Sequence, residues 1–319
     1  MMEYTYLGAT GLKVSVAGLG CGGNSRLGQS TGSSFEESVA IVRGALDLGV
    51  NFFDTAEVYG TEEILGVALQ NIDRDSVVIS TKSRVRAHEN SSSVVEVVAS
   101  LDRSLQKLQT DYVDVFHVHA VKPHEYPFVR DVIVPPLLRE REKGKFRHLG
   151  ITETPPNDAK HAMLGKAFAD DVWEVIMVGF HMMNQNARKL VFSSTQGKQI
   201  GTLIMFAVRS IFSDPRYLQT TIDKLVENGE LDTKYGDTTE PLGFLLGDGG
   251  AESVVDAAYR YVRHELGVDV VLFGTGNSEH LATNIKSILR NPLSPRLVQQ
   301  MSQDMGHLEG VGLDLPRNR

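Results

Sequence analysis

The sequence contains almost no cysteine and no long apolar or basic run. Its 319 residues include one cysteine, Cys21, so no disulfide can form within the chain, and a reducing cytoplasm is the simplest location. No stretch approaches the ~18 apolar residues of a membrane-spanning helix, and the polar, aromatic start Met1–Gly8 does not resemble a signal peptide. The net charge is -8, and no dense cluster of Lys and Arg indicates a nucleic-acid surface. We therefore predict a cytoplasmic protein without a membrane or nucleic-acid partner.

The sequence does contain a regular alternation of short apolar runs and longer amphipathic ones. Hydrophobic residues make up 41% of the chain, enough for a large core. The apolar runs predict strands at Val16–Gly20, Val50–Asp54, Val77–Thr81, Tyr112–His119, Phe146–Ile151, Trp173–Val178, Gly201–Val208 and Val268–Phe273. Amphipathic runs predict helices at Phe35–Leu48, Glu62–Leu69, Val94–Leu108 and Asp131–Lys143. Because strands that alternate with helices pair in parallel, about eight such units predict an α/β fold, the (β/α)8 TIM barrel.

Three segments fall outside this alternation. The N-terminal stretch EYTYLGATGLKVS has a Gly-Ala-Thr-Gly turn between alternating residues, which predicts a short β-hairpin ahead of the barrel. A long insertion is predicted between strands seven and eight, at about residues 209–267, and an extra helix at Pro295–Leu308. Since no linker, repeat or low-complexity tract interrupts the chain, we predict a single domain over residues 1–319.

A glycine-rich motif after the first strand could indicate a different fold, the dinucleotide-binding Rossmann fold. GLGCGG places Gly18, Gly20 and Gly23 at the spacing of a dinucleotide-binding fingerprint. That fingerprint needs a helix to start at once, so that the helix N-terminus meets the diphosphate. Here the loop sequence NSRLGQSTGSS follows instead. We therefore expect a close-packed loop after the first barrel strand, in which Cys21 packs as a small residue.

A pair of histidines, His117 and His119, ends the fourth strand. Residues two apart on a strand point to the same face, so both side chains could line the barrel interior. Metal-dependent barrel hydrolases use such a pair as ligands, together with further His and carboxylate ligands on other strands. His148 lies on the fifth strand, but no complete ligand set emerges at the strand ends. We predict no bound metal, and a metal-dependent hydrolase stays an open alternative.

Four polar residues coincide with the ends of three successive strands. Asp54 ends the second strand, Lys82 the third and His119 the fourth, while Tyr59 lies in the loop after the second. In a parallel barrel these ends lie side by side on one face. A free tyrosine has a pKa near ~10, and a neighbouring ammonium favours the phenolate. We expect Asp54 to hold Lys82, Lys82 to tune Tyr59 towards neutrality, and Tyr59 to transfer a proton to a carbonyl oxygen as hydride arrives at carbon.

With these residues in view, the sequence resembles the aldo-keto reductase family. GVNFFDTAEVYGTEEILGVAL is similar to the family's hallmark segment after the second strand, ISTK to its lysine strand, and LQTDYVDVFHVH to the segment that ends in its histidine. REKGKFRHLGIT resembles the fifth-strand stretch, and VDVVLFGTGNSEHLATNIKSI the closing strand, loop and helix. The resemblance covers nearly the whole chain, in order. It implies a (β/α)8 barrel and NADPH-dependent carbonyl reduction, or the reverse oxidation of an alcohol or sugar.

The same resemblance implies roles for individual residues. Tyr59 would be the acid/base, His119 would orient the carbonyl, and Asp54 and Lys82 would complete the catalytic tetrad. The implied cofactor-binding residues are Asp54, Thr152, Arg209, Gly274, Thr275, Gly276, Asn277, His280 and Asn284. The family's usual Ser-Asn pair after strand five is Thr152-Glu153 here, and GTGNSEHL lacks the Lys and Arg that often grip a 2′-phosphate. The resemblance favours NADP(H), and these departures leave NAD(H) possible.

Two more functions remain open besides the hydrolase. A lysine at a barrel strand end can form a Schiff base, so Lys82 would suit a lyase. Some members of the family bind cofactor and act mainly as regulatory subunits. The substrate depends on the loops at residues 24–34, 120–130 and 209–250, and neither its identity nor the oligomeric state follows from the sequence.

Overall fold

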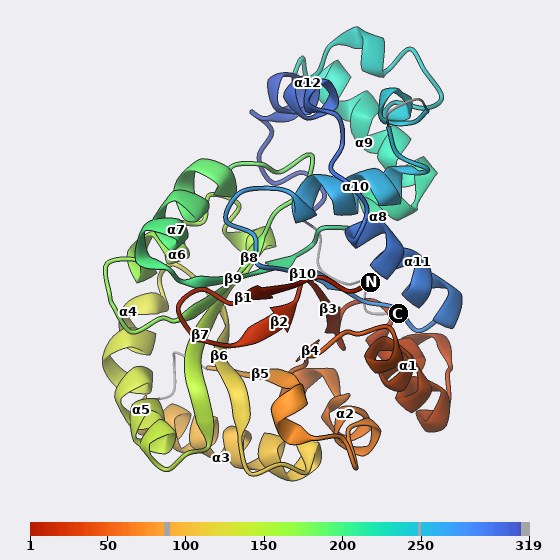
Figure 1. Ribbon diagram of the computed structural model, residues 1–319. Helices are drawn as coiled ribbons and strands as arrows, with labels where there is room; N and C mark the ends of the chain where they lie inside the picture. The colour runs from red at the N-terminus through yellow and green to blue at the C-terminus, as the bar shows by residue number, and fades with distance from the viewer. Residues whose placement is uncertain (86–89, 248–249, 314–319) are drawn as a thin grey trace.

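A computed structural model describes residues 1–85, 90–247 and 250–313. Three stretches lie outside the described residues: 86–89, 248–249 and 314–319. The second falls inside the predicted insertion, and the third is the last part of the predicted single domain. The described residues form a closed barrel of eight parallel strands, in the order β10-β3-β4-β5-β6-β7-β8-β9 (Figure 1). These strands are β3 Ala17–Gly20, β4 Phe52–Asp54, β5 Val78–Arg84, β6 Val113–Val121, β7 Phe146–Glu153, β8 Val175–Gly179, β9 Gly201–Met205 and β10 Val270–Phe273. The predicted (β/α)8 barrel is confirmed.

Several strands end elsewhere than the apolar runs predict. β5 continues three residues further than predicted, to Arg84, and β6 and β7 continue two residues further, to Val121 and Glu153. Between Val118 and Val121 the β6–β7 register shifts, and Ala120 has a φ of 58°, which is the geometry of a β-bulge. The predicted seventh strand ends early, at Met205 instead of Val208, because Phe206 has a φ of 69° and cannot continue the ladder.

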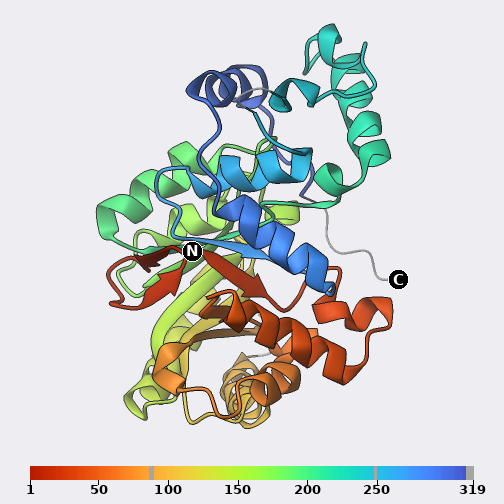
Figure 2. The same ribbon diagram turned by 45° about the vertical axis from the view of Figure 1, so that its right-hand side comes forward.

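Helices surround the barrel (Figures 1 and 2). They are α1 Phe35–Asp47, α2 Glu62–Ala68, α3 Asn90–Leu108, α4 Tyr126–Phe128, α5 Val134–Glu142, α6 Ala162–Ala167, α7 Ser193–Lys198, α8 Ser210–Ser213, α9 Pro215–Glu227, α10 Val254–Arg263, α11 Ser278–Ile288 and α12 Pro295–Met305. The π-helical segments η4 Val129–Ile133 and η6 Arg188–Phe192 join α4 to α5 and precede α7. No helix in the described part of the chain is long and apolar enough to cross a membrane.

Residues 209–267, predicted as one insertion, have two structural roles. The last part is α10, which packs against β10 and α11 as a barrel-covering helix. The part before it, from β9 to α10, carries α8, α9 and two short 3-10 turns, η7 Thr233–Tyr235 and η8 Gly243–Leu245. The predicted extra helix is present as α12, and the Tyr235 hydroxyl donates to Asp304 of α12 at 2.5 Å. Both views show α9 and α12 beyond the helical ring, at one end of the molecule (Figures 1 and 2).

The predicted N-terminal hairpin closes the bottom of the barrel. Strands β1 Tyr4–Tyr6 and β2 Lys13–Ser15 pair antiparallel. Leu7, Leu12 and Val14 of this hairpin join a buried cluster with the inward-facing residues at the strand starts: Phe52, Val78, Val115, Val175, Leu203 and Val270. The contact is close, since a Cβ at Gly201 would lie 2.6 Å from Cγ of Leu7. The hairpin therefore plugs the amino-terminal end and leaves the carboxyl-terminal end open.

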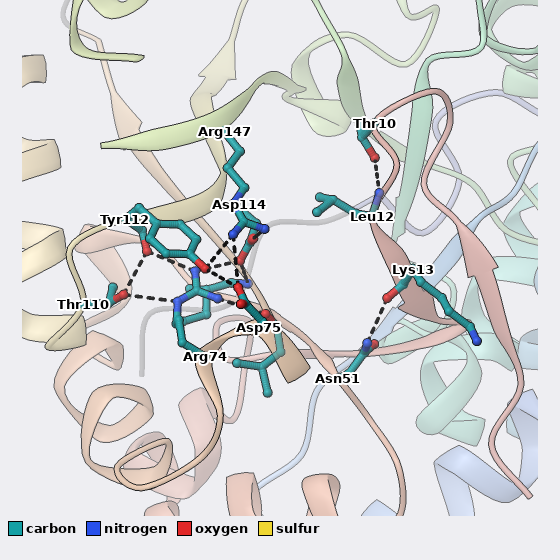
Figure 3. Close-up of polar contacts among 12 residues, drawn as sticks. Thr10, Leu12, Lys13, Asn51, Arg74, Asp75, Thr110, Tyr112, Asp114 and Arg147 are labelled. Atoms are coloured by element: carbon teal, nitrogen blue, oxygen red, sulfur yellow. Dashed lines mark hydrogen bonds and ion pairs between the residues drawn. The ribbon is translucent and has the colours of Figure 1, made fainter. Parts of the chain in front are cut away.

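A polar cluster ties three strand starts together on the same bottom face (Figure 3). The buried Asp114 accepts hydrogen bonds from Arg74 Nη2 at 2.7 Å and from the Ile79 amide at 2.9 Å, and it pairs with Arg147 Nη1 at 3.2 Å. The ring of Tyr112 lies between the two guanidinium groups, 4.1 Å from Arg74 and 4.4 Å from Arg147. Polar residues at this end of a TIM barrel contribute to stability.

We expect Asp114→Ala to lower the free energy of unfolding by about 2–4 kcal/mol, because the buried Ile79 amide loses its acceptor and two cations lose their shared partner. Asp75→Ala, in the same cluster but 79% exposed, is the matched control and should change stability by less than about 0.5 kcal/mol. Urea denaturation measures both. Equal effects of the two substitutions would contradict the assignment of Asp114 as the centre of the cluster.

Candidate active site

A cleft of about 1190 Å³ opens at the carboxyl-terminal end of the barrel. Its wall includes Asp54, Tyr59 and His119, which come from β4, the turn after it and β6, and Gly274, His280 and Asn284, which follow β10. The segment after β9 closes part of the rim with Phe206, Arg209, Leu242 and Leu246. The open end of the barrel is thus a deep, mixed polar and apolar site, the usual place for the active site of a TIM barrel.

A buried ion pair lies at the base of this cleft. Lys82 Nζ contacts both carboxylate oxygens of Asp54 at 2.6 Å and donates to the Thr55 carbonyl at 2.8 Å. Ser80 Oγ donates to the same carboxylate at 2.9 Å. Burial opposes the charge on Lys82, yet the adjacent Asp54 carboxylate raises the pKa of the ammonium above its ordinary value. Lys82 is therefore a fixed cation, the wrong state for a Schiff-base nucleophile, which must be a neutral amine.

Tyr59 ends the short 3-10 turn η2 Glu57–Tyr59 that follows β4. The Glu57 carboxylate accepts hydrogen bonds from Ser100 and Arg103 of α3, both at 2.6 Å, which anchors the turn. On the other side the tyrosine ring lies against Gly22, where a Cβ would be 2.5 Å from Cε2 of the ring. Only glycine fits there. Gly22, the first glycine of the final pair in GLGCGG, therefore makes room for Tyr59, a role that was not predicted from the sequence.

Tyr59 and His119 face each other across the cleft floor. The Tyr59 hydroxyl lies 3.4 Å from His119 Nε2, and the two rings are nearly perpendicular, with their centroids 5.7 Å apart. Lys82 Nζ lies 5.2 Å from the centroid of the Tyr59 ring. All four residues predicted from the strand ends are thus brought together. A carbonyl oxygen placed between the hydroxyl and Nε2 would meet two groups that can hydrogen-bond to it.

The protonation states follow from burial. Burial raises the pKa of Tyr59, and the lowering effect of Lys82 does not overcome it. The expectation that Lys82 tunes the pKa of Tyr59 towards neutrality is therefore wrong for this structure. Burial, followed by the charges of Lys82 and Arg84, holds the pKa of His119 well below its usual range. At neutral pH the site contains a protonated phenol beside a neutral imidazole, a state suited to giving a proton.

His117 has a different environment from His119. Its ring packs on Gly150, where a Cβ would lie 2.2 Å from Nδ1, and neither ring nitrogen has a hydrogen-bond partner among the described residues. Burial and the charge of Lys82 hold the pKa of His117 well below its usual range, so the ring is neutral. Within residues 1–85, 90–247 and 250–313, no group of three or more His, Cys, Asp or Glu side chains could hold a metal ion.

The predicted cofactor residues divide between the cleft wall and the framework beneath it. Asp54, Arg209, Gly274, Thr275, His280 and Asn284 line the cleft. Thr152 is buried, and its hydroxyl accepts a hydrogen bond from the Ala120 amide at 2.7 Å. Gly276 lies against Gly28, where a Cβ would be 2.3 Å from the Gly28 Cα, and Asn277 Oδ1 caps α11 by accepting from the amides of Glu279 and His280. Gly276 and Asn277 thus shape the loop that presents the others.

The glycine-rich loop itself is part of the cleft. Gly20, Gly22 and Gly23 lie on its wall, and the chain continues through a 3-10 segment, η1 Arg26–Thr31, before α1 begins at Phe35. The glycines are therefore followed by a 3-10 segment and not directly by the N-terminus of an α-helix, in agreement with the predicted loop. Cys21 is buried, which raises the pKa of its thiol and leaves it a packing residue.

Three features of the cleft were not predicted. Arg84, two residues after Lys82 on β5, lines the cleft, a position that strand alternation could have indicated. Glu153, also on the wall, accepts from the Gly179 amide at 2.9 Å and lies 2.8 Å from His161 Nδ1. Phe206 stacks under Arg209, with the guanidinium carbon 4.3 Å from the ring centroid. The Glu153 contact with Gly179 joins two different strands, so no local pattern reveals it, and the Phe206–Arg209 contact is local but depends on the positive φ of Phe206.

The sequence is similar to those of known oxidoreductases. The model of the Aldo/keto reductase family matches residues 18–303. The chain is 38% identical over 160 residues to L-galactose dehydrogenase of Arabidopsis thaliana, a match that covers 48% of this chain and 49% of that protein, so it spans about half the length of that relative. It is 23% identical over 295 residues to the uncharacterized oxidoreductase YqkF of Bacillus subtilis, covering 90% of this chain and 91% of YqkF.

The fold has a counterpart among solved structures. An aldo-keto reductase from Bacillus halodurans, in its holo form, superposes with a TM-score of 0.71 at 19% identity, covering 98% of this chain and 100% of that one. At this identity the likeness concerns the fold alone.

Proposed function

The chain belongs to the aldo/keto reductase family, and from this premise we propose that it is an NAD(P)H-dependent oxidoreductase that reduces an aldehyde or ketone. The observation that carries the proposal is the contact of the Tyr59 hydroxyl with His119 Nε2, beside the Lys82–Asp54 pair, on the floor of the cleft. We assign Tyr59 as the general acid/base, His119 as the group that orients the carbonyl, and Lys82 and Asp54 as the pair that fixes the charge around them.

The residues of the cleft fit a nicotinamide dinucleotide. The volume of about 1190 Å³ is somewhat larger than that of ordinary small-molecule sites, as a dinucleotide together with a substrate requires, and Gly274, Thr275 and Asn284 after β10 line part of it. Arg209 on the rim suits the diphosphate, and Thr152 retains a hydroxyl proton that it can donate near the nicotinamide. The bound cofactor would supply hydride to the carbonyl carbon.

The proton that the reaction needs is transferred by side chains of this protein. Tyr59 donates its hydroxyl proton to the carbonyl oxygen as negative charge develops there, and His119 shares the hydrogen bond to that oxygen. Lys82, held by Asp54 and the Thr55 carbonyl, remains charged throughout and stabilises the phenolate that Tyr59 leaves behind. In the reverse direction the phenolate takes the proton of an alcohol. L-galactose dehydrogenase, the relative at 38% identity, supports oxidation of a sugar as the second candidate direction.

We propose NADP(H) as the favoured cofactor, with modest discrimination against NAD(H). The cleft-lining residues on α11 include no Lys or Arg. His280 can supply a ring N–H donor, while the amides of Glu279 and His280 already bond to Asn277 Oδ1. A 2′-phosphate would thus meet few strong donors here. The single buried cysteine agrees with the cytoplasmic location that we also propose.

Titration of the protein with NADPH and with NADH, followed by protein fluorescence, tests this function. We expect saturable binding of both, with NADPH tighter by less than about tenfold, which corresponds to about 1.4 kcal/mol. His280→Ala should remove most of that preference and leave NADH affinity in place. Binding of neither cofactor would overturn the proposal. Binding without turnover of any aldehyde would favour the cofactor-binding regulatory barrel.

A further inference from the structure

One cation of the cleft has no role in the chemistry described so far. Arg84 is the last residue of β5, two positions beyond Lys82, so its side chain points to the same side of the strand. It is exposed and lines the cleft near Tyr59 and His119. Its charge is close enough to lower the pKa of both residues, although it is not the largest influence on either.

Arg84 differs from the other charged residues on this side of the cleft in lacking a counter-ion. Asp54 is paired with Lys82, Glu153 with His161, and Glu125 with Lys122. Among the described residues, no carboxylate lies within 4.0 Å of the Arg84 guanidinium, and this group donates no hydrogen bond to any of them. A charged side chain beside the reacting groups is thus available to a ligand.

The barrel topology separates Arg84 from the cofactor side of the cleft. Gly274, Thr275, His280 and Asn284 follow β10, and Arg209 follows β9. In the strand order, β3 and β4 lie between β10 and β5, and β6, β7 and β8 lie between β5 and β9. An anion that Arg84 binds would therefore come from the substrate and not from the cofactor diphosphate.

We propose that Arg84 binds a carboxylate of the substrate, so that the enzyme prefers carbonyl compounds that carry this group a short distance from the reacting carbon. A guanidinium can bind a carboxylate through two parallel hydrogen bonds, which fixes orientation as well as affinity. With the carboxylate held at the end of β5, the rest of the molecule extends towards Tyr59 and His119. Lys82 cannot do this, because its donors are occupied by Asp54 and Thr55. The inference rests on the proposed carbonyl reduction and specifies its substrate class.

A matched pair of substrates tests the proposal: 4-carboxybenzaldehyde and its methyl ester. The readout is the ratio of kcat/KM for the acid to kcat/KM for the ester, in wild type, Arg84→Met and Arg84→Lys. We expect the ratio to fall by ~10–100-fold in Arg84→Met, as expected for loss of a charged hydrogen-bonded pair. The loss should lie mainly in KM of the acid, because the carboxylate is bound in ground state and transition state alike. Any effect of the charge on Tyr59 and His119 acts on both substrates and cancels in the ratio.

Two comparisons keep the result interpretable. Arg84→Lys should retain part of the preference, since the charge remains but the two-pronged geometry is lost. Lys122→Met removes a cation from the same wall and should leave the ratio within about threefold of wild type, because its charge is already paired with Glu125. An unchanged ratio in Arg84→Met, or a fall only in Lys122→Met, overturns the proposal. Turnover of neither substrate by the wild type would instead overturn the carbonyl reductase function itself.

Discussion

Replacement of Tyr59 by Phe is expected to lower kcat/KM for aldehyde reduction by about 10²–10⁴-fold, the contribution of a well-placed general acid. The substitution removes the hydroxyl that lies 3.4 Å from His119 Nε2 and keeps the ring that packs against Gly22. Cofactor affinity and the free energy of unfolding should therefore stay close to wild type. Steady-state kinetics with NADPH and 4-nitrobenzaldehyde, together with a cofactor titration, measure these effects.

Tyr112→Phe is the matched control for that experiment. It removes a phenolic hydroxyl from the bottom face of the barrel, where Tyr112 contacts Asp75 and Arg147 (Figure 3). We expect its reduction kinetics to equal those of wild type. If Tyr59→Phe kept more than about a tenth of wild-type turnover, the proton would have to come from another group, because general acid catalysis contributes more than that.

Replacement of Lys82 by Met is expected to abolish turnover and to destabilise the fold. The change leaves the Asp54 carboxylate buried without its cation, and breaking a buried ion pair in this way costs about 3–5 kcal/mol. It also removes the charge that stabilises the Tyr59 phenolate. Urea denaturation and steady-state kinetics measure the two effects.

The double variant Lys82→Met/Asp54→Leu separates stability from chemistry. With both charges replaced by apolar groups, most of the lost stability should return, while turnover should not. Recovery of turnover in the double variant would show that the ion pair serves the fold alone. Unchanged stability in Lys82→Met would contradict the buried geometry of the pair, whose side chains are 1% and 5% exposed.

The sequence was sufficient to place Asp54, Lys82 and His119 together because parallel strands end on one face, and a polar residue in an apolar run marks that end. Tyr59 followed from its loop position. The direction of its pKa shift did not follow, since the balance between burial and the charge of Lys82 depends on how deeply the cleft encloses the ring. Strand ends were misplaced where the backbone adopts positive φ, at Ala120 and Phe206, because neither residue type signals it.

The loop after β10 was predicted only as a cofactor site, and it has a structural role as well. Asn277 before the acidic residue Glu279 is an ordinary helix-capping pattern, and the structure uses it as one. The close approach of Gly276 to Gly28 joins segments far apart in the sequence. The hydrogen bond from the Gly179 amide to Glu153 likewise joins two different strands, β8 and β7. Such contacts need the folded barrel and could not be predicted from local patterns.

The central claim is that this chain transfers hydride to a carbonyl and a proton from Tyr59. The most direct test supplies wild-type protein with NADPH that carries deuterium at the transferred position of the nicotinamide, together with 4-nitrobenzaldehyde, and analyses the product by mass spectrometry. We predict an alcohol with one deuterium on the former carbonyl carbon, formed by wild type at least about 100-fold faster than by Tyr59→Phe. Full binding of NADPH with no deuterated alcohol from the wild type would contradict the claim.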